Sequence, residues 1–547
     1  MISTLSLSRL ARRALPSWAA FALLTAACLA AVILGHDGRR AAQVAMLALP
    51  LLLWLRWPIE RPPWRRVRAV LATTGIALFL LDGAARAWLA TQYQATPDSS
   101  LVLAAAANTT PRETAEYLAS QSHALVLAIG LALVGPGLTI LAVRVATRDQ
   151  AALSRPGRVI LLTLMALCVL AHLSKPWRRH HPLVFWPAWT QDVAELRHAW
   201  SDQQGQRDQL MRNARAASPT LSSDAPATVV LVLTDSVNRD NMSLYGYGRP
   251  TTPQLTALAR EESTRLLTLR HAWSVEAGTL ASLSGLFSFG ERDEDDPAGR
   301  AQHLLALART AGYKIWWMSN HDDVAVDQQH ARLADEVEMI NRQPGRSSAS
   351  LDGELLDCLE EALIDPAPRK LVVVHLLGAH PHYRMRMPAG DNPFDDDSDA
   401  VDQGMIRAGH PMWLRESRQD YDAAIRYHDG VVAETLRLTR RHVPQAGRGA
   451  WMFLSDHGQE VGHSIAHAGH SPGTPAGYRI PTLMWRTGAD FDAATAARPF
   501  RADWAGWTIA DLLQLRWTGM QDERNVLDAR YAWEAPRLKA PVVRFDR

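Results

Sequence analysis

Five long apolar stretches in the first third of the chain constrain its fold more than any other feature. They are Trp18–Leu34, Ala41–Leu55, Val67–Ala90, Ala124–Val143 and Val159–His172. A helix of roughly 20 apolar residues crosses a bilayer core, so each stretch is a candidate membrane span. The second and fifth need flanking residues to complete a crossing. The alternative is a signal peptide followed by buried core helices, but apolar blocks separated by arginine clusters favour five spans.

The arginines between these stretches predict the orientation of the chain. They form three clusters: Arg9, Arg12 and Arg13; Arg56, Arg61, Arg65, Arg66 and Arg68; and Arg144, Arg148, Arg155 and Arg158. With five spans all three clusters fall on one side, which the positive-inside rule makes cytoplasmic. Arg39 and Arg40, in the first turn, are a mild exception. Everything after the fifth span is therefore expected outside the cytoplasm.

Charge and cysteine content exclude several classes of protein. The net charge of +2 over 547 residues gives no global field for binding nucleic acid. Cys28 and Cys168 lie in predicted spans, which leaves Cys358 alone in the rest of the chain. Neither a disulfide within a soluble domain nor a zinc-finger spacing is available. The part outside the membrane must therefore be stable through its hydrophobic core.

Beyond the spans, short apolar runs alternate with helical patterns, as in an α/β domain. The expected strands are Thr228–Leu233, Lys314–Met318, Leu371–Val374, Trp451–Leu454 and Ile480–Trp485, and the clearest amphipathic helix is Asp420–Arg441. Such alternation predicts a mainly parallel central sheet covered on both faces. We therefore expect a transmembrane domain over residues 1–173, a bridging helix and linker over 174–227, and an α/β domain over 228–547.

Metal-ligating side chains follow the expected strands. Asp235 comes just after the first strand, and Asp456 and His457 follow a later one. Ligands of α/β sheets bind beyond the carboxyl ends of the strands, so these side chains should share one crevice. Carboxylates and imidazole without thiolate suit Zn²⁺, or less readily Mn²⁺, in a catalytic site. For Asp235 alone, an N-cap is an equal alternative. The acidic segment Asp391–Asp402 could hold a cation, but its composition favours a solvated loop.

A hydroxyl nucleophile is expected at a helix N-terminus, where backbone N–H groups receive anions. Thr279 follows Gly278 and precedes the small-residue run Leu280–Phe287. An ordinary N-cap is the alternative for Thr279, and the sequence by itself favours that alternative. Ser282 and Ser284 are weaker candidates for the nucleophile.

Histidines gather in two segments, His375 to His382 and His463 to His470. They could bind phosphate, transfer a proton or hold a second metal, although a single histidine is more often structural. From the residues alone these alternatives stay open for His375, His380, His467 and His470.

The motifs together resemble the membrane-bound phosphoethanolamine transferases of Gram-negative bacteria, within the alkaline phosphatase/sulfatase superfamily. They are Asp240–Tyr247 (DNMSLYGY) with Thr251-Thr252-Pro253, His375 with Gly378-Ala379-His380, Tyr421-Asp422 with Tyr427 and Asp429, and Ser455-Asp456-His457-Gly458. The segment from Asp365 to Gly378 and the missing disulfides are most similar to the branch that modifies the lipopolysaccharide core.

This resemblance implies a role for each matching residue. Asp235, Thr279, Asp456 and His457 would hold the metal, with Thr279 as nucleophile. His375 and His380 would act in catalysis and substrate binding. Asn320 and either His467 or His470 would also bind substrate. Two departures stand out: Thr234-Asp235 replaces the family's usual Gly-Glu, and the match around Thr279 is loose.

The implied function is the transfer of phosphoethanolamine from phosphatidylethanolamine to lipopolysaccharide, on a core sugar or on lipid A, through a phospho-threonine-type intermediate. The resemblance further implies one Zn²⁺ with room for a second, a multi-pass monomer in the inner membrane, and a catalytic domain in the periplasm. The alternatives are a glycerol-phosphate transferase, a phosphodiesterase or sulfatase-type hydrolase, and a membrane sensor with an inactive catalytic domain.

Overall fold

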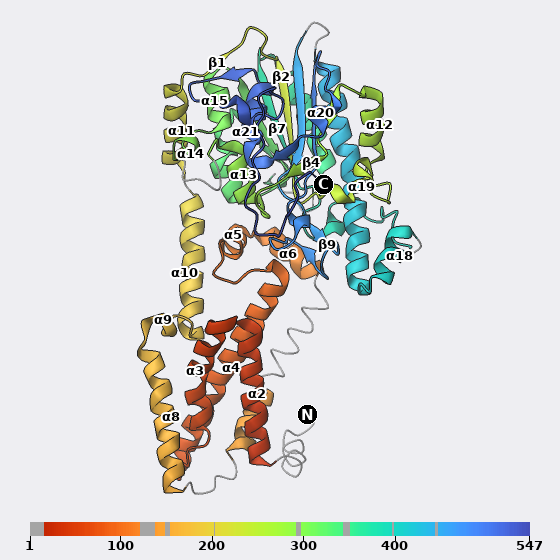
Figure 1. Cartoon of the computed structure of the whole chain (residues 1–547). Coiled ribbons are helices and arrows are strands. Elements are labelled where there is room, and N and C mark those ends of the chain that lie inside the picture. Colours follow the sequence, from red (N-terminus) through yellow and green to blue (C-terminus); the bar gives the residue numbers. More distant parts are fainter. Residues whose placement is uncertain are drawn as a thin grey trace. The chain divides into compact units, whose positions relative to one another are not determined.

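The computed structural model describes residues 16–120, 137–147, 154–201, 203–290, 297–342, 350–396, 399–443 and 447–546 (Figure 1). They fall into two compact units. The first lies within Met1–Ala107 and Pro111–Leu196, and the second within Asn108–Thr110 and Arg197–Arg547.

The first unit is helical. Its helices are α2 (Ser17–Gly35), α3 (Gly38–Trp54), α4 (Pro62–Tyr93), α5 (Ser100–Asn108), α6 (Pro111–Ser120), α8 (Arg155–Leu173), α9 (Lys175–Arg178) and α10 (Pro182–Ser201), the last continuing into the second unit. Among the described residues, α2, α4 and α8 are long and apolar enough to cross a membrane. They correspond to the first, third and fifth predicted spans.

The predicted number of five spans is not confirmed. Helix α3 covers the second predicted span but has only 17 residues, and it is not among the three helices that qualify by length and composition. Most of the fourth predicted span lies outside the described residues, and its described end belongs to the short apolar helix Gly137–Ala146.

Small residues allow α2 and α4 to pack closely. A Cβ atom placed on Gly83 would lie 2.2 Å from the carbonyl oxygen of Ala31, so only glycine permits this approach. Next to it, the buried carboxylate of Asp82 accepts hydrogen bonds from Arg86 Nε at 2.8 Å and Trp186 Nε1 at 2.9 Å, and lies 3.0 Å from His36 Nε2. Several partners thus satisfy a charge that would be costly if buried alone.

The second unit is built on a seven-stranded sheet in the described part of the chain. The strand order is β3 (Leu266–Thr268), β11 (Thr482–Arg486), β8 (Gly449–Ser455), β2 (Thr228–Thr234), β7 (Lys370–Leu376), β5 (Lys314–Ser319) and β6 (Glu336–Met339). The strands from β8 to β6 are parallel, but β11 runs antiparallel to both β8 and β3. The prediction of a mainly parallel sheet is therefore corrected to a mixed sheet.

Both faces of this sheet are buried, because successive side chains of a strand point to opposite faces. In β2, Val229, Leu231 and Leu233 enter one hydrophobic cluster, whereas Val230 and Val232 enter another. Residues of α13 (Thr279–Phe287), α15 (Leu304–Thr310) and α21 (Ala505–Leu512) complete the first cluster. Those of α12 (Pro253–Glu262), α17 (Leu355–Ile364) and α19 (Met412–His442) complete the second (Figure 1).

Smaller elements surround this layered core. The pairs β1 (Thr220–Leu221) with β13 (Leu515–Arg516) and β9 (Glu460–Val461) with β10 (Ala468–Gly469) are antiparallel, and β4 (His271–Trp273) with β12 (Pro499–Arg501) is parallel. The remaining helices are α11 (Gln204–Ala216), α14 (Pro297–Arg300), α16 (Val324–Gln329), α18 (Ala400–Arg407) and α20 (Ala493–Ala496). All five predicted strands are present with boundaries within a few residues of those predicted, and the predicted amphipathic helix begins earlier, at Met412.

Candidate active site

Asp235, Asp456 and His457 converge at the carboxyl ends of two neighbouring strands. Strands β2 and β8 pair in parallel with Thr234 opposite Ser455, so the residues that follow lie side by side. One ligand atom from each of the three residues lies within 4.8 Å of the others. His457 Nε2 is 3.8 Å from Asp235 Oδ1 and 3.5 Å from Asp456 Oδ2.

The chemistry of this cluster fits a divalent metal. All three residues are buried, and among the described residues Asp456 Oδ2 and His457 Nε2 have no hydrogen-bond partner. Such atoms are costly to bury unless a ligand satisfies them. Burial and the neighbouring charge of Asp235 raise the pKa of Asp456 to about 6. Two carboxylates held this close favour a cation between them.

A second layer of hydrogen bonds fixes the backbone after β2. The Ser236 N–H donates to Asp456 Oδ1 at 3.1 Å. The hydroxyl of Tyr421 on α19 donates to the Ser236 carbonyl at 2.6 Å and accepts from the Asn238 N–H at 2.8 Å. The short helix that follows, Arg239–Asn241, is capped by Asn238. Asp235 is therefore not its N-cap, and Tyr421 of the Tyr-Asp motif braces the loop that carries Asp235.

Thr279 lies beside Asp235 at the start of α13. Gly278 is the N-cap of this helix and Thr279 its first helical residue, so the N-cap alternative for Thr279 does not apply. The Thr279 hydroxyl donates to Asp235 Oδ2 at 2.9 Å. It therefore combines contact with a metal-type carboxylate and the N-terminus of a helix, which favours an incoming anion.

The hydroxyls of Ser282 and Ser284, the weaker candidates for the nucleophile, bond to other groups than Asp235. Ser284 Oγ donates to the Leu280 carbonyl within α13, and Ser282 Oγ lies 3.3 Å from Ser274 Oγ. Ser274 also donates to the Asp456 carbonyl at 2.6 Å. The serine pair thus ties the segment before Thr279 to the metal-type cluster.

His375 is buried inside β7, although the sequence analysis placed it beyond the strand. Its Nδ1 lies 3.0 Å from the Ser319 hydroxyl, and its ring stacks on that of His321 at 4.1 Å. Burial, followed by the charge of His321, holds the pKa of His375 well below its usual value.

His380 lies on the turn after β7, which rests on the backbone of Asp235. The Ala379 N–H donates to the Asp235 carbonyl at 3.0 Å. Gly378 has a φ of +56°, and a Cβ on it would lie 2.1 Å from Thr234 Oγ1. Burial disfavours the charge of His380 and holds its pKa well below the usual value, so a neutral imidazole lies next to Asp235.

The structure separates the two later histidines. The His470 ring lies 4.7 Å from that of His457, and burial lowers the pKa of His470 to about 3. His467 is buried, with Nε2 3.1 Å from the His470 carbonyl. His470 is therefore the histidine that lies beside the cluster, and His467 supports its backbone.

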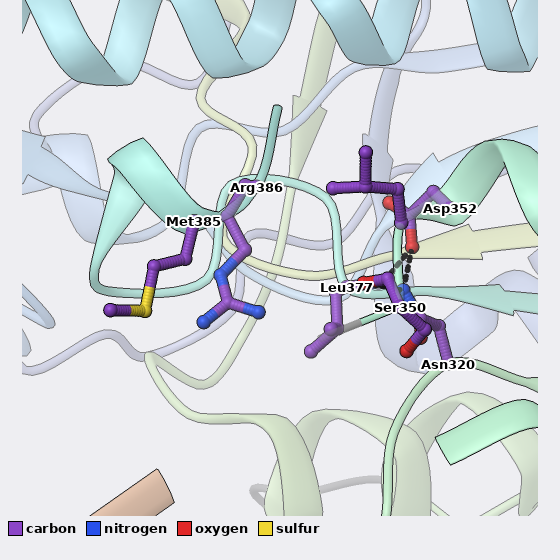
Figure 2. A pocket seen from close by; sticks show the side chains of 7 residues that line it. Asn320, Ser350, Asp352, Leu377, Met385 and Arg386 are labelled. Atoms are coloured by element: carbon purple, nitrogen blue, oxygen red, sulfur yellow. Dashed lines mark hydrogen bonds between the residues drawn. The ribbon is translucent and has the colours of Figure 1, made fainter. Parts of the chain in front are cut away.

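Asn320 lines a small hollow together with Ser350, Leu351, Asp352, Leu377, Met385 and Arg386 (Figure 2). Its side chain donates to Asp352 Oδ1 at 2.8 Å and accepts from the Ser350 hydroxyl. These bonds, drawn in Figure 2, hold Asn320 in the protein interior. Its geometry favours support of the turn after β7 over the predicted contact with substrate.

Gly458 of the Ser-Asp-His-Gly motif is required by close packing, since a Cβ there would lie 2.2 Å from the Ala476 carbonyl oxygen. In the acidic segment, Asp399 and Asp402 lie 2.6 Å and 3.9 Å from the Arg249 guanidinium. Asp402 is buried, so this end of the segment is a paired core feature instead of a solvated loop.

Two known family models match parts of this chain. Residues 227–500 match the sulfatase family model, which is half of the chain. The chain belongs to the sulfatase family. Residues 68–180 match the model described as phosphoethanolamine transferase EptA/EptB. The predicted resemblance to the membrane-bound phosphoethanolamine transferases of this superfamily is confirmed.

Individual relatives of this sulfatase-family chain are also phosphoethanolamine transferases. Phosphoethanolamine transferase EptC of Escherichia coli (strain K12) is 27% identical over 537 residues, which cover 91% of the chain and 88% of that protein. The crystal structure of the C-terminal periplasmic domain of the E. coli EptC, in complex with Zn, is 29% identical with a TM-score of 0.52 and covers 58% of the chain and 91% of that domain.

A likeness in fold extends over both units. The integral membrane protein lipooligosaccharide phosphoethanolamine transferase A of Neisseria meningitidis has a TM-score of 0.56 and 18% identity, with 93% of the chain and 97% of that protein covered. At this identity the likeness concerns the fold alone.

Proposed function

We propose that this protein transfers phosphoethanolamine from phosphatidylethanolamine to lipopolysaccharide through a covalent intermediate on Thr279. The observation that carries the proposal is the 2.9 Å hydrogen bond from the Thr279 hydroxyl to Asp235, beside buried Asp456 and His457 atoms that lack a partner among the described residues. The names of the relatives support phosphoethanolamine as the transferred group.

Asp235, Thr279, Asp456 and His457 would hold one Zn²⁺, for which their oxygen and nitrogen donors are suitable. When bound, the metal supplies charge neutralisation at the phosphoryl oxygen and a lower pKa for the threonine hydroxyl. The crystal structure of the E. coli EptC periplasmic domain in complex with Zn supports this choice of metal.

In the first step, the Thr279 oxygen attacks the phosphorus of the lipid. The bond between phosphorus and the diacylglycerol oxygen breaks, and that oxygen takes up the proton that the threonine loses. The backbone N–H groups at the start of α13 orient the anionic phosphoryl group. The product is diacylglycerol and a phosphoethanolamine-threonine.

In the second step, a hydroxyl or phosphate of the lipopolysaccharide attacks the same phosphorus, and its proton passes to the departing Thr279 oxygen. We assign the assistance of this transfer to His380, a neutral imidazole beside Asp235, with His470 on the side of His457. His375 contacts Ser319 and His321 inside β7, so we propose that it supports the site instead of accepting the proton.

The arginine distribution and the apolar helices α2, α4 and α8 support an inner-membrane protein with the second unit in the periplasm. In that position the lipid donor is concentrated in two dimensions at the membrane surface, which favours encounter with the site.

The test is mass spectrometry of lipopolysaccharide from a Gram-negative host that lacks its own phosphoethanolamine transferases. We expect a species heavier by one phosphoethanolamine group with the wild-type chain and with Thr279→Ser. Thr279→Ala should abolish it while purified protein still binds Zn²⁺. The matched control is Ser284→Ala, because this exposed serine of the same helix bonds only to its own helix backbone in the described structure.

Labelled lipid donors identify the transferred group. Label from the ethanolamine of phosphatidylethanolamine should enter the acceptor, and should remain on Thr279 when the acceptor is withheld. Transfer of glycerol phosphate, release of the free headgroup, or full activity of Thr279→Ala would each overturn the proposal.

A further inference from the structure

His321 is a buried histidine to which the reaction described above assigns no task. It follows β5, and its side chain is 4% exposed. Its ring stacks on His375 with centroids 4.1 Å apart and an interplanar angle of 14°. Its centroid lies 6.1 Å from that of His380 in a T-shaped arrangement. The ring therefore lies against His375 in β7 and close to His380 on the turn that rests on Asp235.

Both ring nitrogens of His321 face groups that accept hydrogen bonds. Nε2 lies 3.0 Å from the Leu376 carbonyl oxygen, and Nδ1 lies 3.4 Å from Asp323 Oδ2. The other oxygen of Asp323 accepts from the Asn108 side chain at 2.6 Å, so this carboxyl also acts as an acceptor there. An imidazole satisfies two acceptors only when both nitrogens carry hydrogen, that is, as a cation.

Burial makes His375 the neutral partner, since it holds the pKa of this histidine well below its usual value. Ser319 Oγ accepts from the His321 backbone N–H at 3.0 Å and lies 3.0 Å from His375 Nδ1, which can accept the hydroxyl hydrogen. A ring nitrogen that accepts is unprotonated. The stack thus consists of one cationic and one neutral imidazole. The groups around each ring favour these two different protonation states.

The charged and titratable groups around His321 come from its own loop (Asp323), from β7 (His375), from the turn after β7 (His380) and from the end of β2 (Asp235). Of these, the two carboxylates favour its cation. Burial opposes the charge, but the hydrogen bond and charge of Asp323, then Asp235 and the Leu376 carbonyl, outweigh it and raise the pKa of His321 to about 10.

We propose that His321 is a permanently protonated positioning residue, which supplies a fixed positive charge to the phosphoryl-binding side of the site and keeps His375 and His380 neutral. This inference rests on the proposed phosphoryl transfer, because a fixed, buried cation stabilises the charge of a phosphodiester and of its transition state without reorganisation. Because His321 is buried in the protein, it does not contact the substrate. It acts through His375 and His380 and through the electric field of its charge.

The protonation state is tested directly on the full chain in lipid vesicles, with isotope-labelled histidine and solid-state NMR. The His321 signals are those lost in His321→Gln. Near neutral pH we expect two protonated ring nitrogens for His321 and a single one for His375. A neutral His321 under these conditions overturns the inference, whatever the activity of the protein.

The role of the charge is tested with His321→Gln, which keeps a donor for Leu376 but loses the cation, and His321→Lys, which keeps a cation. We expect kcat/KM for transfer to fall roughly tenfold to a hundredfold in His321→Gln. This is less than the roughly hundredfold to thousandfold loss seen when a donor in contact with an oxyanion is removed, because His321 acts through its neighbours. Competitive inhibition by inorganic phosphate should weaken in parallel. His321→Lys should recover part of both, and His442→Gln, a change at the surface pair with Glu360, should retain wild-type values.

The outcomes separate this inference from the proposed function. Equal losses of kcat/KM in folded His321→Gln and His321→Lys would mean that the shape of the side chain matters and its charge does not. That result would overturn the inference about His321. A wild-type chain without transfer overturns the proposed function, whereas the NMR signals of His321 still decide its protonation. If His321→Gln does not fold, labelling of the wild type and of His321→Lys decides the same question.

Discussion

Asp352 accepts a 2.8 Å hydrogen bond from the backbone N–H of Gly378, which joins the segment just before α17 to the turn between His375 and His380. The other oxygen of the same carboxylate accepts from the Leu377 N–H at 2.9 Å. This turn lies on the backbone of Asp235. One buried carboxylate therefore fixes the distance between the histidine segment and the metal-type cluster.

Asp352→Asn should impair transfer more than folding. The amide keeps one acceptor, so one of the two backbone N–H groups then faces an NH₂ group and loses its partner, at a cost of about 1–3 kcal/mol. We expect a lower melting temperature, a larger fractional loss of kcat than of bound Zn²⁺, and wild-type behaviour for Asp357→Asn, an exposed change in α17, the helix that follows Asp352. Unchanged kcat in a folded Asp352→Asn would show that the turn does not depend on this carboxylate.

Gly378→Ala tests the contact between the turn and β2. The added Cβ would approach Thr234 Oγ1 to 2.1 Å and the Asp235 carbonyl oxygen to 2.6 Å. Gly390→Ala is the matched control, because Gly390 also has a positive φ, of +82°, but nothing lies within 4 Å of the added atom. Both changes carry backbone strain of about 1 kcal/mol. Only Gly378→Ala should also displace Asp235, with loss of transfer and weaker Zn²⁺ binding; equal effects in both variants would argue against the contact.

Asp456→Asn should remove the metal, because it replaces a carboxylate that has an unpartnered buried oxygen in the described structure. We expect elemental analysis of the purified chain to find much less Zn²⁺, and a chelator to lower the melting temperature of the wild type but not of this variant, since a ligand of the folded state stabilises it. Asp395→Asn, an exposed change in the acidic segment, should leave the metal content unchanged. Loss of metal in Asp395→Asn would instead place a cation site in that segment.

The site residues that come directly after a strand could be predicted from the sequence. Apolar runs define β2 and β8, and parallel neighbours bring Asp235, Asp456 and His457 to one edge. The direction of β11 could not be predicted, because an apolar run has the same composition in a parallel and an antiparallel strand. The position of His375 inside β7 was missed for a related reason, since the last buried residue of a strand depends on its partners.

Residues whose role depends on distant partners were not predicted. His321 stood next to Asn320 in the sequence, but its charge arises from Leu376 and Asp323, which the fold brings to its two nitrogens. Asp352 lies before α17 and follows no strand, so only the folded chain shows that it holds the turn at Gly378. A histidine or aspartate directly after a strand can be recognised in the sequence. A hydrogen-bonding partner that is distant in the chain cannot.

Stability should depend on pH through His321. Its pKa is raised from 6.5 to about 10 in the folded chain, so the folded state binds the proton more tightly than the unfolded state. This contribution is complete below pH 6.5 and is lost as the pH rises through about 10. Over that interval the wild type should lose up to about 1.4 kcal/mol of unfolding free energy per pH unit relative to His321→Gln.

Thermal unfolding of both proteins, followed by tryptophan fluorescence at a series of pH values, measures this difference. Groups common to both proteins, such as Asp429 and His470, titrate in each and cancel in the comparison to first order. His442→Gln should retain the wild-type slope, because it removes a surface histidine paired with Glu360 and leaves His321 in place. Parallel curves for wild type and His321→Gln between pH 6.5 and about 10 would mean that His321 is already neutral in the folded chain. The cluster of His321, His375 and His380 would then be neutral, and His321 would supply no positive charge beside the phosphoryl group.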